Sequence, residues 1–200
     1  MLAVWNDILS KALRCVDEVH PELNTDNAEF FPVSQFLIEA ATYVLRVAPP
    51  RALGTGKDMP VDSLTAYEDG SGSMPLPSNF LRLASFRMKG WKRSVNIPIF
   101  DDSPRYQQQF NLTLRGGEEF PVVALCDGLT RLEYFSSRLG PYAEVEVAKY
   151  HPVPNYDEEC PASLVDAVAW KAAELSLSAM TDTNAAQIAA QKVIEHIQAL

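Results

Sequence analysis

The spacing of the apolar residues constrains the fold of this chain most strongly. Near both ends the spacing is that of helices, and in the middle apolar and polar residues alternate as they do in strands. Near the N-terminus, apolar side chains recur every three or four residues, which predicts amphipathic helices over residues 2–19 and 32–47. The apolar face predicted for the first helix consists of Leu2, Trp5, Leu9, Ala12, Leu13 and Val16. Pro49 and Pro50 then end the second helix. The same spacing predicts two further helices near the C-terminus, over residues 160–180 and 185–200, with a break and helix cap over 181–184. The residues that the first of these should bury are Leu164, Val165, Val168, Ala172 and Leu175.

The middle of the chain has the pattern of strands joined by turns. Asp127-Gly128 lies between two apolar runs and is the strongest hairpin signal in the sequence. The strands we expect are 61–68, 73–76, 85–92, 95–100, 120–126, 129–135 and 142–150. Ser78-Asn79 resembles a helix cap and predicts a short helical turn over 80–83.

This order of elements predicts an α+β fold, in which the N- and C-terminal helices together form a helical bundle and a central antiparallel β region is inserted between them. We expect a single domain of 200 residues. Within it, residues 1–50 and 160–200 are helical, and residues 60–150 form a β-rich insertion.

The only basic region of this acidic chain lies between Ser71 and Val95. Residues 74–115 carry seven basic and two acidic side chains, whereas the segments before and after them have net charges of −6 and −8. The alternation after Ser85 predicts a half-buried strand with a cationic outer face. A binding surface is one interpretation of this face, and ordinary solvated Lys and Arg side chains are the other.

Residues suited to catalysis or to metal binding are scattered. The three cysteines and three histidines lie far apart, which favours free buried thiols and structural histidines. The loop Gly54–Asp58 lacks the first glycine of a phosphate-binding loop and has Asp58 where a hydroxyl residue is needed. We therefore expect no enzymatic activity, no cofactor and no metal, although an enzyme whose site is assembled from distant residues stays an alternative.

No run of the sequence reaches 18 apolar residues, and the N-terminus lacks the pattern of a signal peptide. The sequence therefore predicts a soluble protein made in a cytoplasm, with no membrane partner.

The order of elements, together with the sequence MPLPSNFLRL at residues 74–83, resembles the head-to-tail connector proteins of tailed bacteriophages. The likeness is to the adaptor or tail tubular protein A type. It implies a structural virion protein that forms a ring of about 12 copies between portal and tail. It also implies a conduit for double-stranded DNA, with the portal protein and other tail or ring proteins as partners. The protein would be located at the head–tail interface, and in the host cytoplasm during assembly.

The resemblance suggests a role for the basic stretch at the interface between subunits, or with the portal. The candidate interface residues are Phe80, Arg82, Arg87, Lys89, Trp91, Lys92 and Arg93. Their partner would be an acidic face formed by the terminal segments of the next copy, and other acidic groups would line the channel. The alternative is a nucleic-acid-binding accessory protein that uses residues 82–93, with Phe86, Trp91 and Tyr106 as stacking groups.

Overall fold

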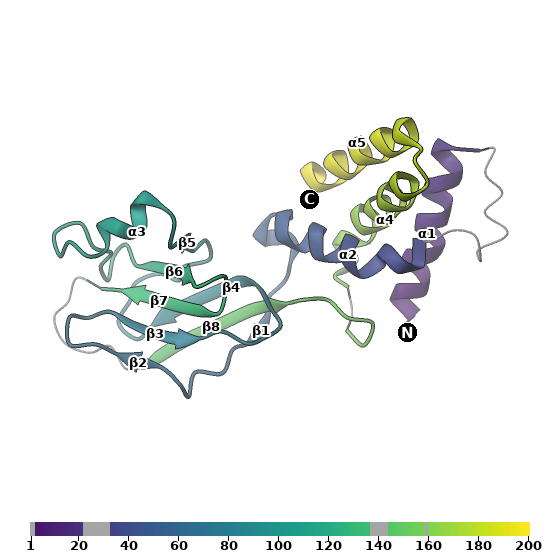
Figure 1. The fold of residues 1–200 in the computed structure, drawn as a ribbon. Helices are drawn as coiled ribbons and strands as arrows, with labels where there is room; N and C mark the ends of the chain where they lie inside the picture. Colours follow the sequence, from purple (N-terminus) through teal and green to yellow (C-terminus); the bar gives the residue numbers. More distant parts are fainter. Residues whose placement is uncertain (1–2, 22–32, 137–143, 159) are drawn as a thin grey trace. The chain divides into compact units, whose positions relative to one another are not determined.

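The fold is α+β, and the computed structural model describes residues 3–21, 33–136, 144–158 and 160–200. The chain forms two compact units (Figure 1). The helical unit comprises Met1–Gly54 and Val153–Leu200, and the β unit comprises Thr55–Pro152. The predicted helical ranges fall in the first unit, and the predicted β insertion falls in the second.

The helical unit is built from both ends of the chain. Its elements are α1 (Ala3–Val19), α2 (Val33–Val47), the 3-10 turn η2 (Pro50–Ala52), the 3-10 turn η3 (Ala162–Leu164), α4 (Val165–Ala179) and α5 (Thr183–Ala199). These helices confirm the predicted ones to within a few residues, although Leu2 and Pro32 lie outside the described residues. None of the helices in the described part of the chain is long and apolar enough to cross a membrane.

Helix α4 is the central helix of this unit, because it packs against α1, α2 and α5. Its buried residues therefore lie on most of its sides: Ala167, Val168, Ala169, Trp170, Ala172, Ala173, Ser176 and Leu177. The sequence predicted that Val165 and Leu175 are also buried, but both are only half-buried. The alanines shorten the distance at which neighbouring helices can pack.

Helix α1 buries one stripe, whose rotation differs slightly from the predicted one. Trp5 is fully buried, and its Nε1 donates a hydrogen bond of 2.8 Å to the backbone oxygen of Glu158. With Trp5 fixed in this way, Ile8 and Cys15 face the core. Leu9 and Leu13, which the sequence assigned to the core, are half-buried instead.

Helix α5 begins at a cap that confirms the predicted break over residues 181–184. The side chain of Asp182 accepts a hydrogen bond of 3.0 Å from the backbone N–H of Ala185. Its Oδ2 also lies 3.2 Å from Nε2 of His20, just after α1. One side chain thus satisfies the start of α5 and contacts the end of α1.

We expect Asp182→Ala to lower the free energy of unfolding of the helical unit by about 1 kcal/mol, because the first turn of α5 loses its side-chain acceptor. Asp182→Asn keeps an acceptor at that position and should retain most of the stability. Urea titration followed by hydrogen exchange of α5 amides measures both variants. Equal stability of Asp182→Ala and the unmodified chain would contradict the assignment of the cap.

The β unit contains two sheets. The first has the strand order β1-β8-β4, formed by β1 (Lys57–Asp58), β8 (Val145–Pro152) and β4 (Phe80–Met88). The second has the order β2-β3-β7-β6-β5, formed by β2 (Thr65–Ala66), β3 (Gly72–Pro75), β7 (Arg131–Phe135), β6 (Val122–Cys126) and β5 (Ile99–Phe100). All neighbours are antiparallel except β5 and β6. Helix α3 (Pro104–Gln108) lies between β5 and β6 in the chain.

The two sheets face each other across one hydrophobic core, which makes the β unit a sandwich (Figure 1). The core residues come from both sheets and their connections: Met59, Met74, Phe80, Leu83, Phe86, Met88, Trp91, Val123, Leu125, Leu132, Tyr134 and Tyr150. A second, smaller apolar cluster on β6 and β7 packs against Tyr106 of α3. The helix therefore covers part of the other face of the five-stranded sheet.

The predicted hairpin at Asp127-Gly128 is confirmed. Strands β6 and β7 pair with Val122 opposite Phe135 and Cys126 opposite Arg131. The connection is longer than the predicted two residues, because it spans residues 127–130 and β7 begins at Arg131 rather than at Leu129. Asp127, Gly128 and Leu129 have positive φ, of 51°, 65° and 69°.

The helical turn predicted over 80–83 is wrong, since these residues begin the long strand β4. They pair with β8, where Phe80 lies opposite Pro152 and Leu83 opposite Tyr150. This pairing buries Phe80 and Leu83, and it outweighs the local capping preference of Ser78-Asn79.

Several predicted strands are shorter than expected. The strand predicted over 85–92 ends at Met88, since Lys89 and Gly90 form a turn. Within 61–68, only Thr65–Ala66 is a strand. Within 95–100, the strand is Ile99–Phe100, and Val95 forms an isolated bridge to Phe86. Pro98 has no backbone N–H to donate, which explains the interruption. Part of the predicted strand 142–150 lies outside the described residues, and β8 begins at Val145.

Candidate interaction surface

Two of the predicted interface residues lie inside the β unit rather than on its surface. Phe80 and Trp91 are only 6% and 4% exposed. Phe80 stacks on Tyr150 with ring centroids 5.9 Å apart, and Trp91 meets Tyr134 edge-on at 6.2 Å. Because these two rings belong to the core, an interface between copies would have to use the charged residues of the predicted set.

The charged residues of the basic stretch are paired within their own unit. Arg87 donates to Glu146 at 2.5 Å, and Lys89 donates to Glu144 at 2.7 Å. Strands β4 and β8 are antiparallel neighbours in which Arg87 lies opposite Val147 and Met88 opposite Val145, so that a register shift leaves Glu146 as an extra residue beside Arg87. Just past the end of the strands, the backbone N–H of Lys89 donates to the backbone oxygen of Glu144 at 2.9 Å. The hydrogen bond to Glu144 raises the pKa of Lys89. The cationic face is therefore a ladder of ion pairs.

Lys92 and Arg93 are fixed by the segment before β6. Lys92 forms an ion pair with Glu119, whose hydrogen bond raises the pKa of the lysine. The guanidinium of Arg93 lies over the ring of Phe120, 4.4 Å from its centroid. Among the residues that the structure describes, Arg93 has no carboxylate partner.

Arg82 differs from the other cations because it is half-buried and lies opposite His151 on β8. Burial lowers the pKa of Arg82. Burial and the charge of Arg82 together lower the pKa of His151, which is therefore neutral at pH 7.

The net charges of the two units differ from those of the three sequence segments, because each unit combines parts of these segments. The helical unit has six basic and fourteen acidic side chains, a net charge of −8. The β unit has eleven basic and twelve acidic side chains, a net charge of −1. The basic stretch is thus balanced inside the β unit, and nearly all of the excess negative charge belongs to the helical unit.

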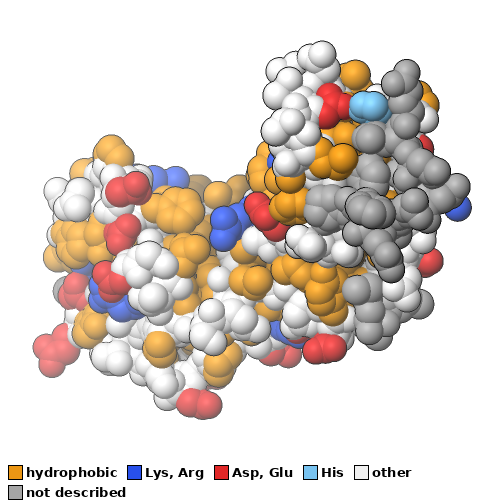
Figure 2. All heavy atoms as spheres, turned by 45° about the vertical axis from the view of Figure 1, so that its right-hand side comes forward, with side chains coloured by type: hydrophobic (Ala, Val, Ile, Leu, Met, Phe, Trp, Pro, Cys, Tyr) orange, Lys and Arg blue, Asp and Glu red, His pale blue; other side chains and the backbone are white. Residues whose placement is uncertain are grey.

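Sequence reasoning missed a second surface on the β unit, the loop between α3 and β6. Four large apolar side chains of this loop are between 52% and 68% exposed: Phe110, Leu112, Leu114 and Phe120. We call this set the apolar loop surface. Figure 2 shows hydrophobic side chains gathered among charged ones over the β unit. The signal in the sequence was FNLTL before Gly116-Gly117, whose alternating apolar residues lie in no strand of the described structure.

A buried guanidinium holds this loop in place. Arg115, whose side chain is only 4% exposed, donates to the backbone oxygen of Gln109 at 2.7 Å. It also donates to the backbone oxygen of Asp69 at 2.7 Å and to its carboxylate at 2.9 Å. Gln109 is itself buried, and its Oε1 accepts from the N–H of Gly116 at 2.9 Å. The loop is therefore tied at both of its ends and to the turn between β2 and β3.

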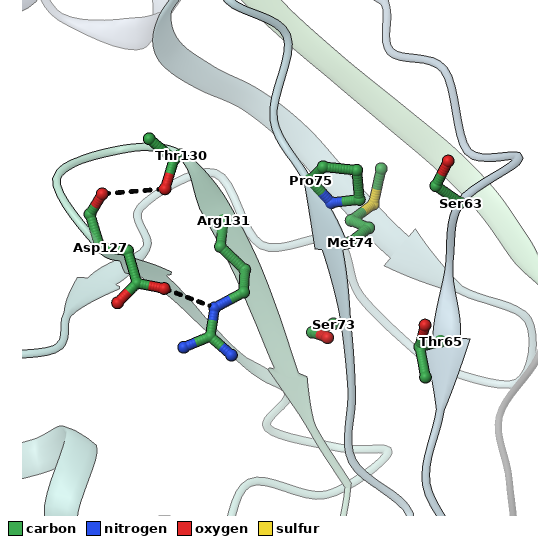
Figure 3. Close-up of a pocket in the computed structure, with 8 residues that line it drawn as sticks. All are labelled: Ser63, Thr65, Ser73, Met74, Pro75, Asp127, Thr130 and Arg131. Atoms are coloured by element: carbon green, nitrogen blue, oxygen red, sulfur yellow. Dashed lines mark hydrogen bonds and ion pairs between the residues drawn. The ribbon is translucent and has the colours of Figure 1, made fainter.

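A hollow of about 280 Å³ lies beside the β6–β7 turn (Figure 3). Hydroxyl groups contribute much of its lining, which consists of Ser63, Thr65, Ser73, Met74, Pro75, Asp127, Thr130 and Arg131. Arg131 contacts Asp127 and Glu133, each at 2.8 Å. Because two carboxylates already neutralise this guanidinium, the hollow does not offer an anion a free positive charge.

The thiols are not poised for nucleophilic chemistry. Burial raises the pKa of Cys15 to about 12, and it raises that of Cys160 to about 11. Burial and the charge of Glu133 raise the pKa of Cys126 to about 11. All three are therefore protonated at neutral pH. Within the described residues, no group of three or more His, Cys, Asp or Glu side chains is arranged to hold a metal ion.

The stacking groups of the nucleic-acid alternative are largely unavailable. Phe86 is fully buried, and Trp91 is nearly so. The hydroxyl of Tyr106 donates to Glu133 at 2.7 Å, and its ring packs against Phe110 and Phe135.

No protein-family model matches the chain, and a comparison with curated proteins also gives no match.

Proposed function

We propose that this chain is a structural subunit of a tailed-phage connector, which forms a ring between portal and tail through which DNA passes. The observation that carries the proposal is the order of the two units along the chain. The helical unit is completed by helices from both ends of the chain, and a β sandwich is inserted between Gly54 and Val153. The resemblance at residues 74–83 implies this same order of a helical bundle and a β domain.

The chemistry of the units suits assembly into a ring. In a closed ring, each copy uses two different faces, one toward each neighbour. The two units differ in charge, with −8 on the helical unit and −1 on the β unit. The acidic helical unit also suits a channel that repels DNA and lets it slide.

The charged face of β4 is the first place to test the proposal. We expect Arg87→Glu with Lys89→Glu to abolish ring formation, because the acidic partner in the next copy loses its cations. Inside the chain, the reversal also sets two new carboxylates against Glu144 and Glu146, which are at least partly solvated. Mass photometry of the assembled complex measures ring formation, and circular dichroism reports whether the monomer stays folded.

A charge-swapped variant separates the contact between copies from the pairing within one chain. Adding Glu144→Lys and Glu146→Lys restores the ion pairs of the ladder with their signs exchanged. We expect this variant to recover the stability of the unmodified chain but not its rings. Recovery of rings would mean that the ladder serves only its own chain.

A further inference from the structure

We propose that the apolar loop surface of one copy docks onto the helical unit of a second copy of this chain. The inference rests on one part of the proposed function, namely that copies of this chain assemble with one another. It goes beyond that function by assigning the contact to Phe110, Leu112, Leu114 and Phe120, which lie outside the basic strand.

The exposure of these side chains is the first argument. Single exposed apolar residues are ordinary on a protein surface, but four large ones within eleven residues mark a site of interaction. They lie between α3 and β6, in a connection of the kind that is usually polar.

The rigidity of the loop is the second argument. Arg115 and Gln109 are buried and hydrogen-bonded so that they hold residues 109–116 in one conformation. Phe110 is further held by edge-on contacts with Tyr106 at 5.3 Å and with Phe135 at 6.1 Å. A surface that is ordered before binding loses less conformational entropy when it binds.

The charges point to the occupant. Arg93 lies on Phe120 with no carboxylate partner among the described residues, and aromatic rings beside arginines are typical of interface centres. The helical unit has a net charge of −8 and therefore offers carboxylates to the guanidinium of Arg93. It also carries exposed apolar side chains of its own: Tyr43, Val47, Met180, Ile188 and Ile194.

Site-specific photo-cross-linking of the purified full chain tests the contact. Benzoylphenylalanine replaces Phe110 in one variant, Leu114 in a second, and the exposed Asp62 in a control. We expect the first two to form cross-linked dimers whose linked peptides come from residues 33–54 or 160–200 of the other copy. The control should give at least about tenfold less of this product. Cross-links to the β unit alone, or no cross-links between copies at millimolar concentration, would overturn the inference.

A second measurement keeps this inference separate from the proposed function. Phe110→Ser with Leu114→Ser should weaken self-association about tenfold or more while the sandwich stays folded, because both side chains are exposed. If this variant forms rings as well as the unmodified chain, docking through the loop is wrong and the connector proposal stands. If the helical unit is cross-linked but no closed ring exists, docking stands and the connector proposal fails.

Discussion

Replacing Phe86 by alanine is expected to destabilise the β unit by about 4 kcal/mol and to leave the helical unit folded. Phe86 is fully buried on β4, and its ring lies 6.0 Å from that of Trp91 and 6.1 Å from that of Tyr134. The substitution removes the centre of this aromatic group and leaves a cavity between the two sheets. The helical unit has a core of its own, built around α4, and does not depend on this group.

Hydrogen exchange during a urea titration measures the two units separately, since amides of β6 and β7 report on one and amides of α4 on the other. Phe100→Ala is the matched control, because Phe100 is an exposed phenylalanine of the same unit and its loss should cost about 0.5 kcal/mol or less. Parallel loss of protection in α4 would show that the units do not unfold independently.

Replacing Arg115 by alanine is expected to cost about 3 kcal/mol, the second largest effect we expect. The guanidinium supplies donors to three oxygen atoms, two of Asp69 and one of Gln109. Without it, backbone oxygens beneath the apolar loop surface lose their partners. Arg115→Lys should recover little, because an ammonium group cannot reproduce the planar set of donors.

The same urea titration measures this effect, and amides of residues 109–117 should lose protection first. Arg131→Ala is the control, since Arg131 is partly exposed and the loss of its ion pairs should cost about 1 kcal/mol or less. Equal effects of the two substitutions would contradict the role assigned to Arg115.

The contact between Arg115 and Asp69 also makes a prediction about pH. Burial acts in the opposite direction, but hydrogen bonds from Ser71 and Arg115 lower the pKa of Asp69 below its usual 3.8. A carboxylate with a lowered pKa stabilises the fold fully above its unfolded pKa, and this stability is lost as the pH falls through the folded pKa. The difference in stability between the unmodified chain and Asp69→Asn should therefore be constant near pH 7 and shrink below pH 3.8.

Local patterns in the sequence were enough to predict the elements whose signal is local. The helical stripes and the turn at Asp127-Gly128 follow from spacing and turn chemistry within a few residues. The strand that starts at Phe80 could not be predicted in this way, because its conformation is set by pairing with β8 about seventy residues later. The all-round burial of α4 likewise depends on three partner helices.

The candidate surface was predictable only in part. The sequence shows the cations of the basic stretch, but the pairing of Arg87 with Glu146 depends on the register of two strands distant in sequence. The clamp formed by Arg115 depends on a turn 46 residues earlier in the chain. Without these contacts, the apolar residues after Phe110 look like part of an ordinary loop.

Electron cryomicroscopy of the particle or complex that contains this chain tests the central claim most directly. We expect its copies to close into a ring of about 12 around a central channel, stacked coaxially on another ring. In that map, the apolar loop surface of each copy should contact the helical unit of the next. Isolated monomers or two-fold dimers within the particle, with no channel between copies, would contradict the connector proposal.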